Sequence, residues 1–205
     1  MRHLTYQQIQ KVYKKYPEYN NINCFVETGT YMGGTIFPMS RHFKKLYTIE
    51  ISPKAYQFCV DSANKKKITN IKFLLGDSFY KLKEVASEIN EPAIYFLDGH
   101  VTENGTGMTG RGKLDVPLMR ELEVINVKHK KPAIIFVDDY RLFGMNKSEE
   151  TAEADWKDIN SERLLNQIDK DRIVKYYTDV DLANKIDRLI IILGEKKSTK
   201  KADNK

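Results

Sequence analysis

Short, strongly apolar segments alternate with longer amphipathic segments along most of this chain. The apolar segments are rich in Ile, Phe and Tyr and are apolar on both faces, which is typical of parallel strands buried inside a sheet. A strand followed by a helix, repeated several times, predicts a parallel sheet that helices cover on both faces. The expected strands are residues 23–29, 46–50, 71–77, 93–98 and 133–139, and the expected helices are residues 35–45, a helix from about Pro53, 78–89 and 116–127.

The last part of the chain follows a different pattern. Segments 173–180 and 187–195 are both strand-like, and only a few residues separate them. Such a short link has no room for a crossover helix, so this pair should be antiparallel. A further helix is expected over about residues 1–20, packed outside the sheet.

Size and composition fit one domain, which we expect to span residues 1–195. The 205 residues are 41% hydrophobic and 30% charged, which is enough for a core and a polar surface. No segment approaches the roughly 20 apolar residues that cross a bilayer, and the N-terminus lacks a signal-peptide pattern. We therefore expect a cytoplasmic protein without a membrane partner. Cys24 and Cys59 lack metal-type spacing and are expected to be buried, reduced thiols.

The net charge of +6 is concentrated at the end of the chain. The last ten residues, 196–205, carry +4 of it, and we expect them to form a disordered, Lys-rich tail. The rest of the chain is nearly neutral, so a nucleic-acid partner is not expected. A small-molecule acceptor fits better, and a homo-oligomer is compatible with the sequence.

A glycine-rich turn joins the first expected strand to the first expected helix. Its sequence runs from Glu27 to Thr35 as E-T-G-T-Y-M-G-G-T. Glycines there let the backbone approach a ligand, and a helix start favours a negative group. Tight turns of this kind also use glycine for purely structural reasons. The spacing does not match G-x-G-x-x-G, which disfavours a dinucleotide.

Every expected parallel strand has an acid at or near its carboxyl end. In open α/β sheets, ligands bind outside those ends. Glu50 lies 21 residues after Gly29 and can accept hydrogen bonds from ribose hydroxyls. Asp77, followed by Ser78, can reach an adenine edge, although an N-cap of the next helix is an equally ordinary role for this aspartate. The acids are Glu27, Glu50, Asp77, Asp98 and Asp138.

A second group of acids follows strands 93–98 and 133–139. If these strands are neighbours, then Asp98, Asp138 and Asp139 converge. Packed carboxylates repel one another, and a divalent cation relieves that repulsion. An all-oxygen ligand set favours Mg²⁺, Mn²⁺ or Ca²⁺. The alternative is that one of these acids pairs with Arg141 and another caps a loop.

These motifs together resemble class I S-adenosylmethionine-dependent methyltransferases. E-T-G-x-x-x-G-G at 27–34, the acid at Glu50, L-D-G at 97–99 and V-D-D-Y at 137–140 carry the likeness, which is strongest to metal-dependent, macrocin-type sugar O-methyltransferases. The resemblance implies a Rossmann-like, doubly wound α/β fold with a seven-stranded sheet in the order 3-2-1-4-5-7-6 and an antiparallel last strand. It also implies that Glu27, Gly29 and Glu50 hold the donor and that Asp98, Asp138 and Asp139 hold the metal, expected to be Mg²⁺. We expect the whole donor site to comprise Glu27, Gly29, Thr30, Gly33, Gly34, Glu50, Asp77 and Ser78.

A long glycine-rich segment, residues 99–115, departs from the family pattern. Five of the residues from 99 to 112 are glycine, so we expect a mobile loop that closes over the bound ligands. His100 begins this loop beside the acids, and with Asp98 it is the expected catalytic group. The alternative for His100 is a hydrogen bond to Asp98 or Glu121. Trp156 is expected to be a packing anchor.

The function expected from the sequence is methyl transfer to a hydroxyl of a small polar, sugar-like molecule, assisted by a divalent metal. Two alternatives remain open. One is a nucleic-acid methyltransferase, whose binding would weaken steeply with salt. The other is a non-catalytic nucleotide-binding protein of the same fold.

Overall fold

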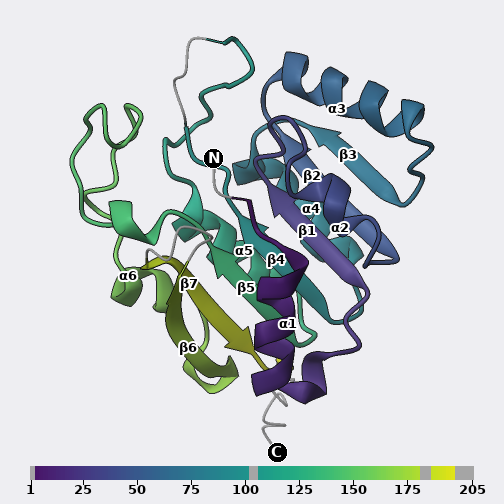
Figure 1. Ribbon diagram of the computed structural model, residues 1–205. Helices are drawn as coiled ribbons and strands as arrows, with labels where there is room; N and C mark the ends of the chain where they lie inside the picture. The colour runs from purple at the N-terminus through teal and green to yellow at the C-terminus, as the bar shows by residue number, and fades with distance from the viewer. Residues whose placement is uncertain (1–2, 102–105, 181–185, 197–205) are drawn as a thin grey trace, which may run out of the picture.

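A computed structural model describes residues 3–101, 106–180 and 186–196. A twisted sheet runs through its centre, with the order β3-β2-β1-β4-β5-β7-β6 (Figure 1). The predicted order and the antiparallel last strand are confirmed. The strands are β1 (Cys24–Thr28), β2 (Lys45–Glu50), β3 (Ile71–Leu75), β4 (Ala93–Leu97), β5 (Ala133–Val137), β6 (Ile173–Val180) and β7 (Ile186–Leu193).

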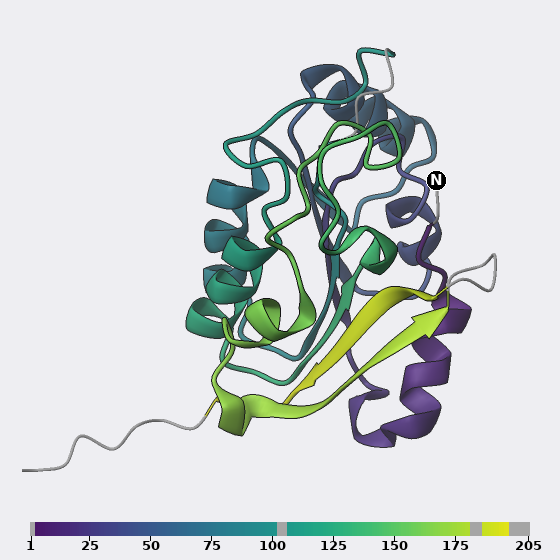
Figure 2. The same ribbon diagram turned by 90° about the vertical axis from the view of Figure 1, so that its left-hand side faces the viewer.

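Helices cover both faces of the sheet (Figure 2). On one side lie α4 (Ser78–Glu88) and α5 (Leu118–Lys128), and on the other side lies α1 (Tyr6–Lys15). Successive side chains of a strand point to opposite faces, so each inner strand supplies both cores. On β4, for example, Tyr95 packs toward α4 and α5, whereas Phe96 packs toward α1. The remaining helices are α2 (Ile36–Met39), α3 (Pro53–Lys65), α6 (Ser161–Leu165) and the 3-10 turns Pro17–Tyr19, Tyr140–Leu142 and Lys170–Arg172.

The strand register brings the carboxyl ends of the central parallel strands level with one another. Thr28 of β1 pairs with Ile49 of β2 and with Leu97 of β4, and Leu97 in turn pairs with Val137 of β5. The residues immediately after this row therefore leave the sheet at one edge. They include the glycine turn and most of the predicted site acids.

Two predicted helices are shorter than expected. The helix predicted over 35–45 is the single turn α2, because the Ser40 hydroxyl bonds the Phe37 carbonyl and the next amides bond carbonyls three residues back. The N-terminal helix ends at Lys15 because Pro17, which follows shortly after, cannot continue an α-helix and starts a 3-10 turn instead.

The predicted tail from 197 onward and residues 102–105 of the predicted loop lie outside the described residues. Cys24 and Cys59 are buried and unpaired. Within the described part of the chain, no helix is both long and apolar enough to span a membrane.

Candidate active site

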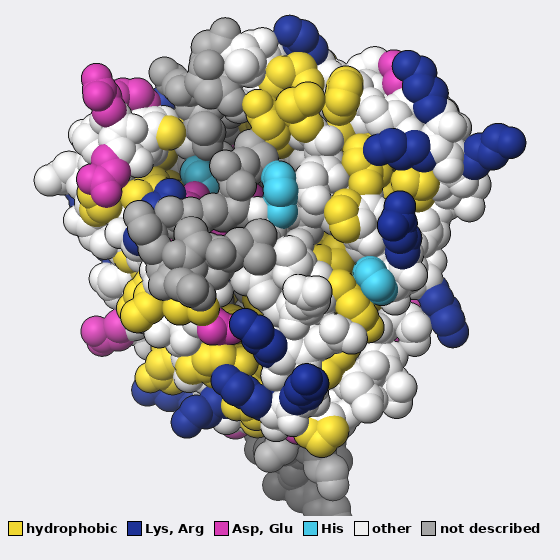
Figure 3. Space-filling view, in the orientation of Figure 1, with side chains coloured by type: hydrophobic (Ala, Val, Ile, Leu, Met, Phe, Trp, Pro, Cys, Tyr) yellow, Lys and Arg dark blue, Asp and Glu magenta, His cyan; other side chains and the backbone are white. Residues whose placement is uncertain are grey.

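A cavity of about 510 Å³ opens at the carboxyl ends of β1 to β5, a size typical of small-molecule sites. Nearly all of the residues predicted to form the site line it, the exceptions being Gly33 and Asp138. One end of the cavity holds the glycine turn with Glu50 and Asp77, and the other holds His100 between two aspartates. Figure 3 shows histidine side chains near the middle of the face seen in Figure 1.

Glu50 ends β2 and fastens the glycine turn. One carboxylate oxygen accepts a hydrogen bond from the Tyr31 amide at 2.7 Å, and the other accepts one from the Ser52 amide at 2.8 Å. Burial raises the pKa of Glu50, and these backbone amides oppose the rise. Backbone hydrogen bonds from Ile51 and Thr30 also lower that pKa, so several main-chain amides hold Glu50 at the wall of the cavity.

Glu27 of β1 lies deeper in the same cavity and is buried. Its Oε2 accepts a hydrogen bond from the Thr48 hydroxyl at 2.8 Å, and Thr48 is in turn hydrogen-bonded to Thr30. Burial raises the pKa of Glu27 to about 8. A cationic ligand group beside it would restore the charged carboxylate.

The glycines of the turn have no side chain, and other parts of the protein pack into the space that a side chain would fill. Gly29 has φ +82°, and a Cβ atom there would lie 2.1 Å from the Asp98 carbonyl oxygen. The turn after β1 therefore rests directly on the end of β4. A Cβ atom on Gly34 would lie 2.0 Å from the His3 ring, and one on Gly33 would meet the ring of Phe37.

Asp77 caps α4, which confirms one of the two roles considered from the sequence, and it also lines the cavity. Its Oδ1 accepts a hydrogen bond from the Phe79 amide at 2.9 Å, and its Oδ2 accepts one from the Lys113 amide at 2.7 Å. The second bond joins Asp77 to the glycine-rich loop. The described part of that loop, 106–115, also packs Gly110 against Ile51, and several of its residues line the cavity.

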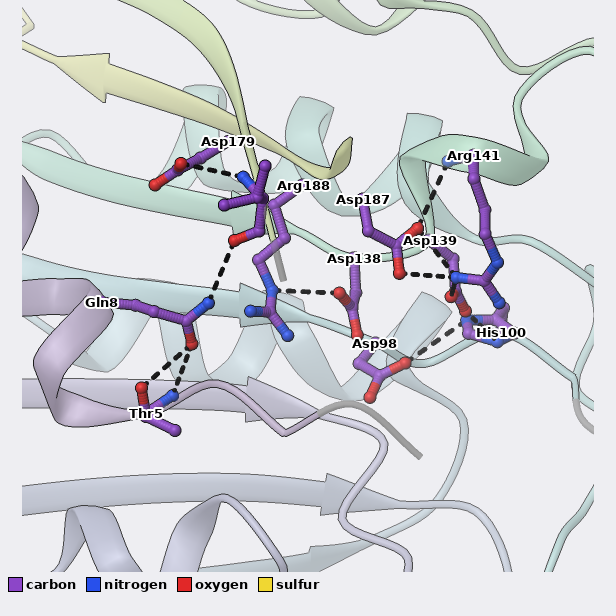
Figure 4. A network of polar contacts seen from close by, with 11 residues as sticks. Thr5, Gln8, Asp98, His100, Asp138, Asp139, Arg141, Asp179, Asp187 and Arg188 are labelled. Atoms are coloured by element: carbon purple, nitrogen blue, oxygen red, sulfur yellow. Dashed lines mark hydrogen bonds and ion pairs between the residues drawn. The ribbon is translucent and has the colours of Figure 1, made fainter. Parts of the chain in front are cut away.

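His100 lies between two carboxylates at the opposite end of the cavity (Figure 4). Its Nε2 is 2.9 Å from Asp139 Oδ2, and its Nδ1 is 3.5 Å from Asp98 Oδ1. Burial and then the nearby acids Asp138 and Asp139 raise the pKa of Asp98 well above its usual range. Burial would raise the pKa of Asp139 too, but His100 and Arg141 outweigh it and lower that pKa to about 2.

Asp138 does not join this group. Its Oδ1 is 3.0 Å from Nε of Arg188 on β7, and both side chains are buried (Figure 4). Burial raises the pKa of Asp138 to about 7, and Arg188 opposes the rise. The reason is local geometry, since Asp139 has a left-handed backbone with φ +55° and leaves the strand toward the cavity. Among the described residues, the atoms that converge as metal ligands would belong to Asp98, His100 and Asp139, whereas the sequence predicted Asp138 in place of the histidine.

Arg141 links Asp139 to a second acid, Asp187. Its guanidinium contacts Asp139 and also bonds both carboxylate oxygens of Asp187, at 2.8 and 2.6 Å (Figure 4). The sequence analysis foresaw an Asp–Arg141 pair as its alternative but missed Asp187. Two adjacent charges, Asp187 and Arg188, interrupt an otherwise apolar strand, and that interruption is the signal that marks them.

Other walls of the cavity come from segments that the sequence analysis did not single out for the site. They are His3 and residues 150–152, with Leu142 beside them. Trp156 is fully buried, as expected for a packing anchor, and its ring meets the His100 ring edge to face with centroids 5.0 Å apart. The histidine is therefore held by two carboxylates and one indole.

No protein-family model matches the chain, and no curated protein matches it. Solved structures do. A Klebsiella pneumoniae protein, named as a candidate O-methyltransferase, has a TM-score of 0.63 at 14% identity, over 93% of this chain and 81% of that one. A Bacillus cereus O-methyltransferase solved with S-adenosylhomocysteine has a TM-score of 0.57 at 12% identity, over 91% of this chain and 80% of that one. An S-adenosylmethionine-dependent methyltransferase from Clostridium acetobutylicum has a TM-score of 0.57 at 9% identity, over 94% of this chain and 99% of that one.

At these identities the likeness concerns the fold. The seven-stranded sheet of this chain, with its order and its antiparallel last strand, is the sheet of Rossmann-like methyltransferases.

Proposed function

We propose that the protein transfers a methyl group from S-adenosylmethionine to a hydroxyl of a small polar molecule. The observation that carries the proposal is one cavity with two chemically different ends. Glu27, Glu50 and the glycine turn form an end suited to the donor, which joins a nucleoside to an amino acid and is positively charged. His100 between two aspartates forms an end suited to taking the proton from the acceptor hydroxyl.

The donor would lie along the strand ends from β3 through β2 to β1, with its methyl group toward β4. Asp77 at β3 lies where the adenine would be read, and Glu50 at β2 where the ribose hydroxyls would be bound. The amino-acid part then reaches the turn after β1, where the buried Glu27 complements its ammonium group. The methyl group consequently points toward His100 and Asp98 at β4.

In the reaction, the acceptor oxygen attacks the methyl carbon while the bond from carbon to sulfur breaks. The sulfur keeps that electron pair and becomes a neutral thioether, and the acceptor proton passes to His100. Positioning of oxygen and methyl in line supplies most of the rate enhancement. General-base catalysis by a held imidazole adds to it.

A divalent cation fits the acceptor end. Asp98 and Asp139 would hold it, and the raised pKa of Asp98 shows a buried carboxyl that a nearby cation would stabilise in its charged form. When bound, the cation would lower the pKa of the acceptor hydroxyl. The two carboxylates are oxygen ligands that suit Mg²⁺ or Mn²⁺, and His100 beside them stays free to act as the base. The motif resemblance to metal-dependent sugar O-methyltransferases supports the same proposal.

Replacing Glu50 with alanine is expected to weaken binding of S-adenosylhomocysteine by about 1.5–3 kcal/mol, or roughly 10- to 150-fold. The variant removes the acceptor of the ribose hydroxyls and releases the Tyr31 amide of the glycine turn. Isothermal calorimetry measures the affinity, and Glu88→Ala, which removes an exposed glutamate paired with Lys72, is the matched control. Tight binding of NAD without binding of S-adenosylhomocysteine would contradict the donor assignment.

Removing the cation is expected to abolish methyl transfer without releasing the donor. We expect Mn²⁺ to bind the wild-type protein and to be lost from Asp98→Asn, because that change removes one of the two carboxylates. Electron paramagnetic resonance measures Mn²⁺ binding, and calorimetry should show that the variant still binds S-adenosylhomocysteine. Asp155→Asn, at an exposed acid outside the cavity, should bind Mn²⁺ like the wild type. Full turnover in excess EDTA would show that the reaction needs no metal.

A further inference from the structure

The N-terminal segment carries His3 to the wall of the donor cavity. Residues 3–5 directly precede α1, and His3 lines the cavity at the carboxyl ends of the strands. Its ring packs so closely on the glycine turn that a Cβ atom on Gly34 would lie 2.0 Å from it. Gly34 therefore has a specific task here, which is to make room for this ring.

His3 is held in place by its neighbours along the chain. Leu4 is buried in the core that α1 shares with the sheet. The Thr5 amide donates a hydrogen bond to Gln8 Oε1 at 3.0 Å, and Gln8 Nε2 donates one to the Val180 carbonyl at 3.3 Å (Figure 4). The segment is thus fixed on both sides of the helix start, and its histidine is a built part of the cavity.

The position of His3 corresponds to one part of the proposed donor. Asp77 and Glu50 lie at the nucleoside part, and the reaction centre lies at β4, so the amino-acid part occupies the end of β1. Glu27 and His3 both line the cavity, and each meets the glycine turn, His3 at Gly34 and Glu27 through a hydrogen bond with Thr35. One is an acid and the other is an imidazole, which are the two partners that a zwitterionic amino acid requires.

We propose that His3 binds the carboxylate of the donor's amino-acid end, as the counterpart of Glu27 at its ammonium group. This inference rests on the proposed function, because it assumes that the donor is S-adenosylmethionine. The imidazole donates a hydrogen bond from a ring nitrogen, and a carboxylate beside it also favours its charged form. Recognition of the amino-acid part thereby depends on a residue about 25 positions before the glycine turn.

The test compares two ligands that differ only at this end. S-adenosylhomocysteine carries the amino-acid group, whereas 5′-methylthioadenosine keeps the nucleoside and the sulfur and lacks that group. We expect His3→Ala to weaken S-adenosylhomocysteine about 10- to 100-fold, as for a lost hydrogen bond to a charged group, and to leave 5′-methylthioadenosine unchanged. His42→Ala removes an exposed histidine that stacks on Tyr6 outside the cavity, and it should alter neither affinity.

Each outcome of this calorimetric comparison has a separate meaning. Selective loss of S-adenosylhomocysteine binding supports the inference. Equal weakening of both ligands would overturn it, because His3 would then only shape the wall, and unchanged affinity for both would overturn it as well. A wild-type protein that binds neither ligand would instead overturn the donor assignment under the proposed function, and the inference with it.

Discussion

Replacing His100 with alanine is expected to lower kcat by about 100- to 10,000-fold, the usual range for loss of a general base. Affinity for S-adenosylhomocysteine should persist, because His100 lies at the acceptor end of the cavity. The measurement is transfer of a radiolabelled methyl group from S-adenosylmethionine to a panel of sugars and other polyhydroxylated molecules. Turnover by the variant is then compared on any acceptor that the wild type methylates.

Two further measurements separate a base from a merely structural histidine. Free imidazole should restore part of the turnover of His100→Ala, because the deletion leaves space between Asp98 and Asp139 for a small base. His42→Ala should keep full turnover. If His100→Ala retains wild-type kcat, the proton leaves by another route and His100 is not catalytic.

Replacing Gly29 with alanine is expected to lower the free energy of unfolding by about 2–5 kcal/mol and to abolish donor binding. Two costs combine in this variant. A side chain at φ +82° costs about 1–2 kcal/mol, and the new Cβ atom would lie 2.1 Å from the Asp98 carbonyl oxygen, which is backbone that has little freedom to move. Urea denaturation measures the stability, and calorimetry measures binding of S-adenosylhomocysteine.

Gly144 provides a closely matched control for that variant. It has φ +80°, almost the same as Gly29, but a Cβ atom there meets nothing within 4 Å. Gly144→Ala should therefore cost only about 1–2 kcal/mol and leave the donor site intact. Equal destabilisation by the two variants would mean that the contact between the glycine turn and β4 does not constrain the site.

The sequence predicted the sheet well because the relevant signals are local. Each strand of β1 to β5 is an apolar run bounded by a turn or a helix, and the short link before β7 leaves room only for an antiparallel pair. Helix lengths were predicted less well. The turn at Ser40 and the stop at Pro17 decide them, and a single residue of this kind is a weaker signal than the helical pattern around it.

The site was predicted as far as strand ends determine it. Glu27, Glu50, Asp77 and Asp98 lie in one cavity because parallel strands with level ends deliver their last residues to the same edge. That rule places a residue at the edge, but it does not state which way its side chain points.

Orientation and distant partners were decided only by the tertiary structure. Asp138 and Asp139 are adjacent in the chain, yet one meets Arg188 and the other meets His100, because a left-handed residue at the strand end separates their directions. His3 meets Gly34, and Arg141 meets Asp187, across long stretches of chain. Such pairs form when packing brings remote backbone together, and a local pattern of residue types carries no information about that approach. The sequence by itself therefore determined the sheet and the edge at which chemistry can occur, and packing decided which side chains face each other there.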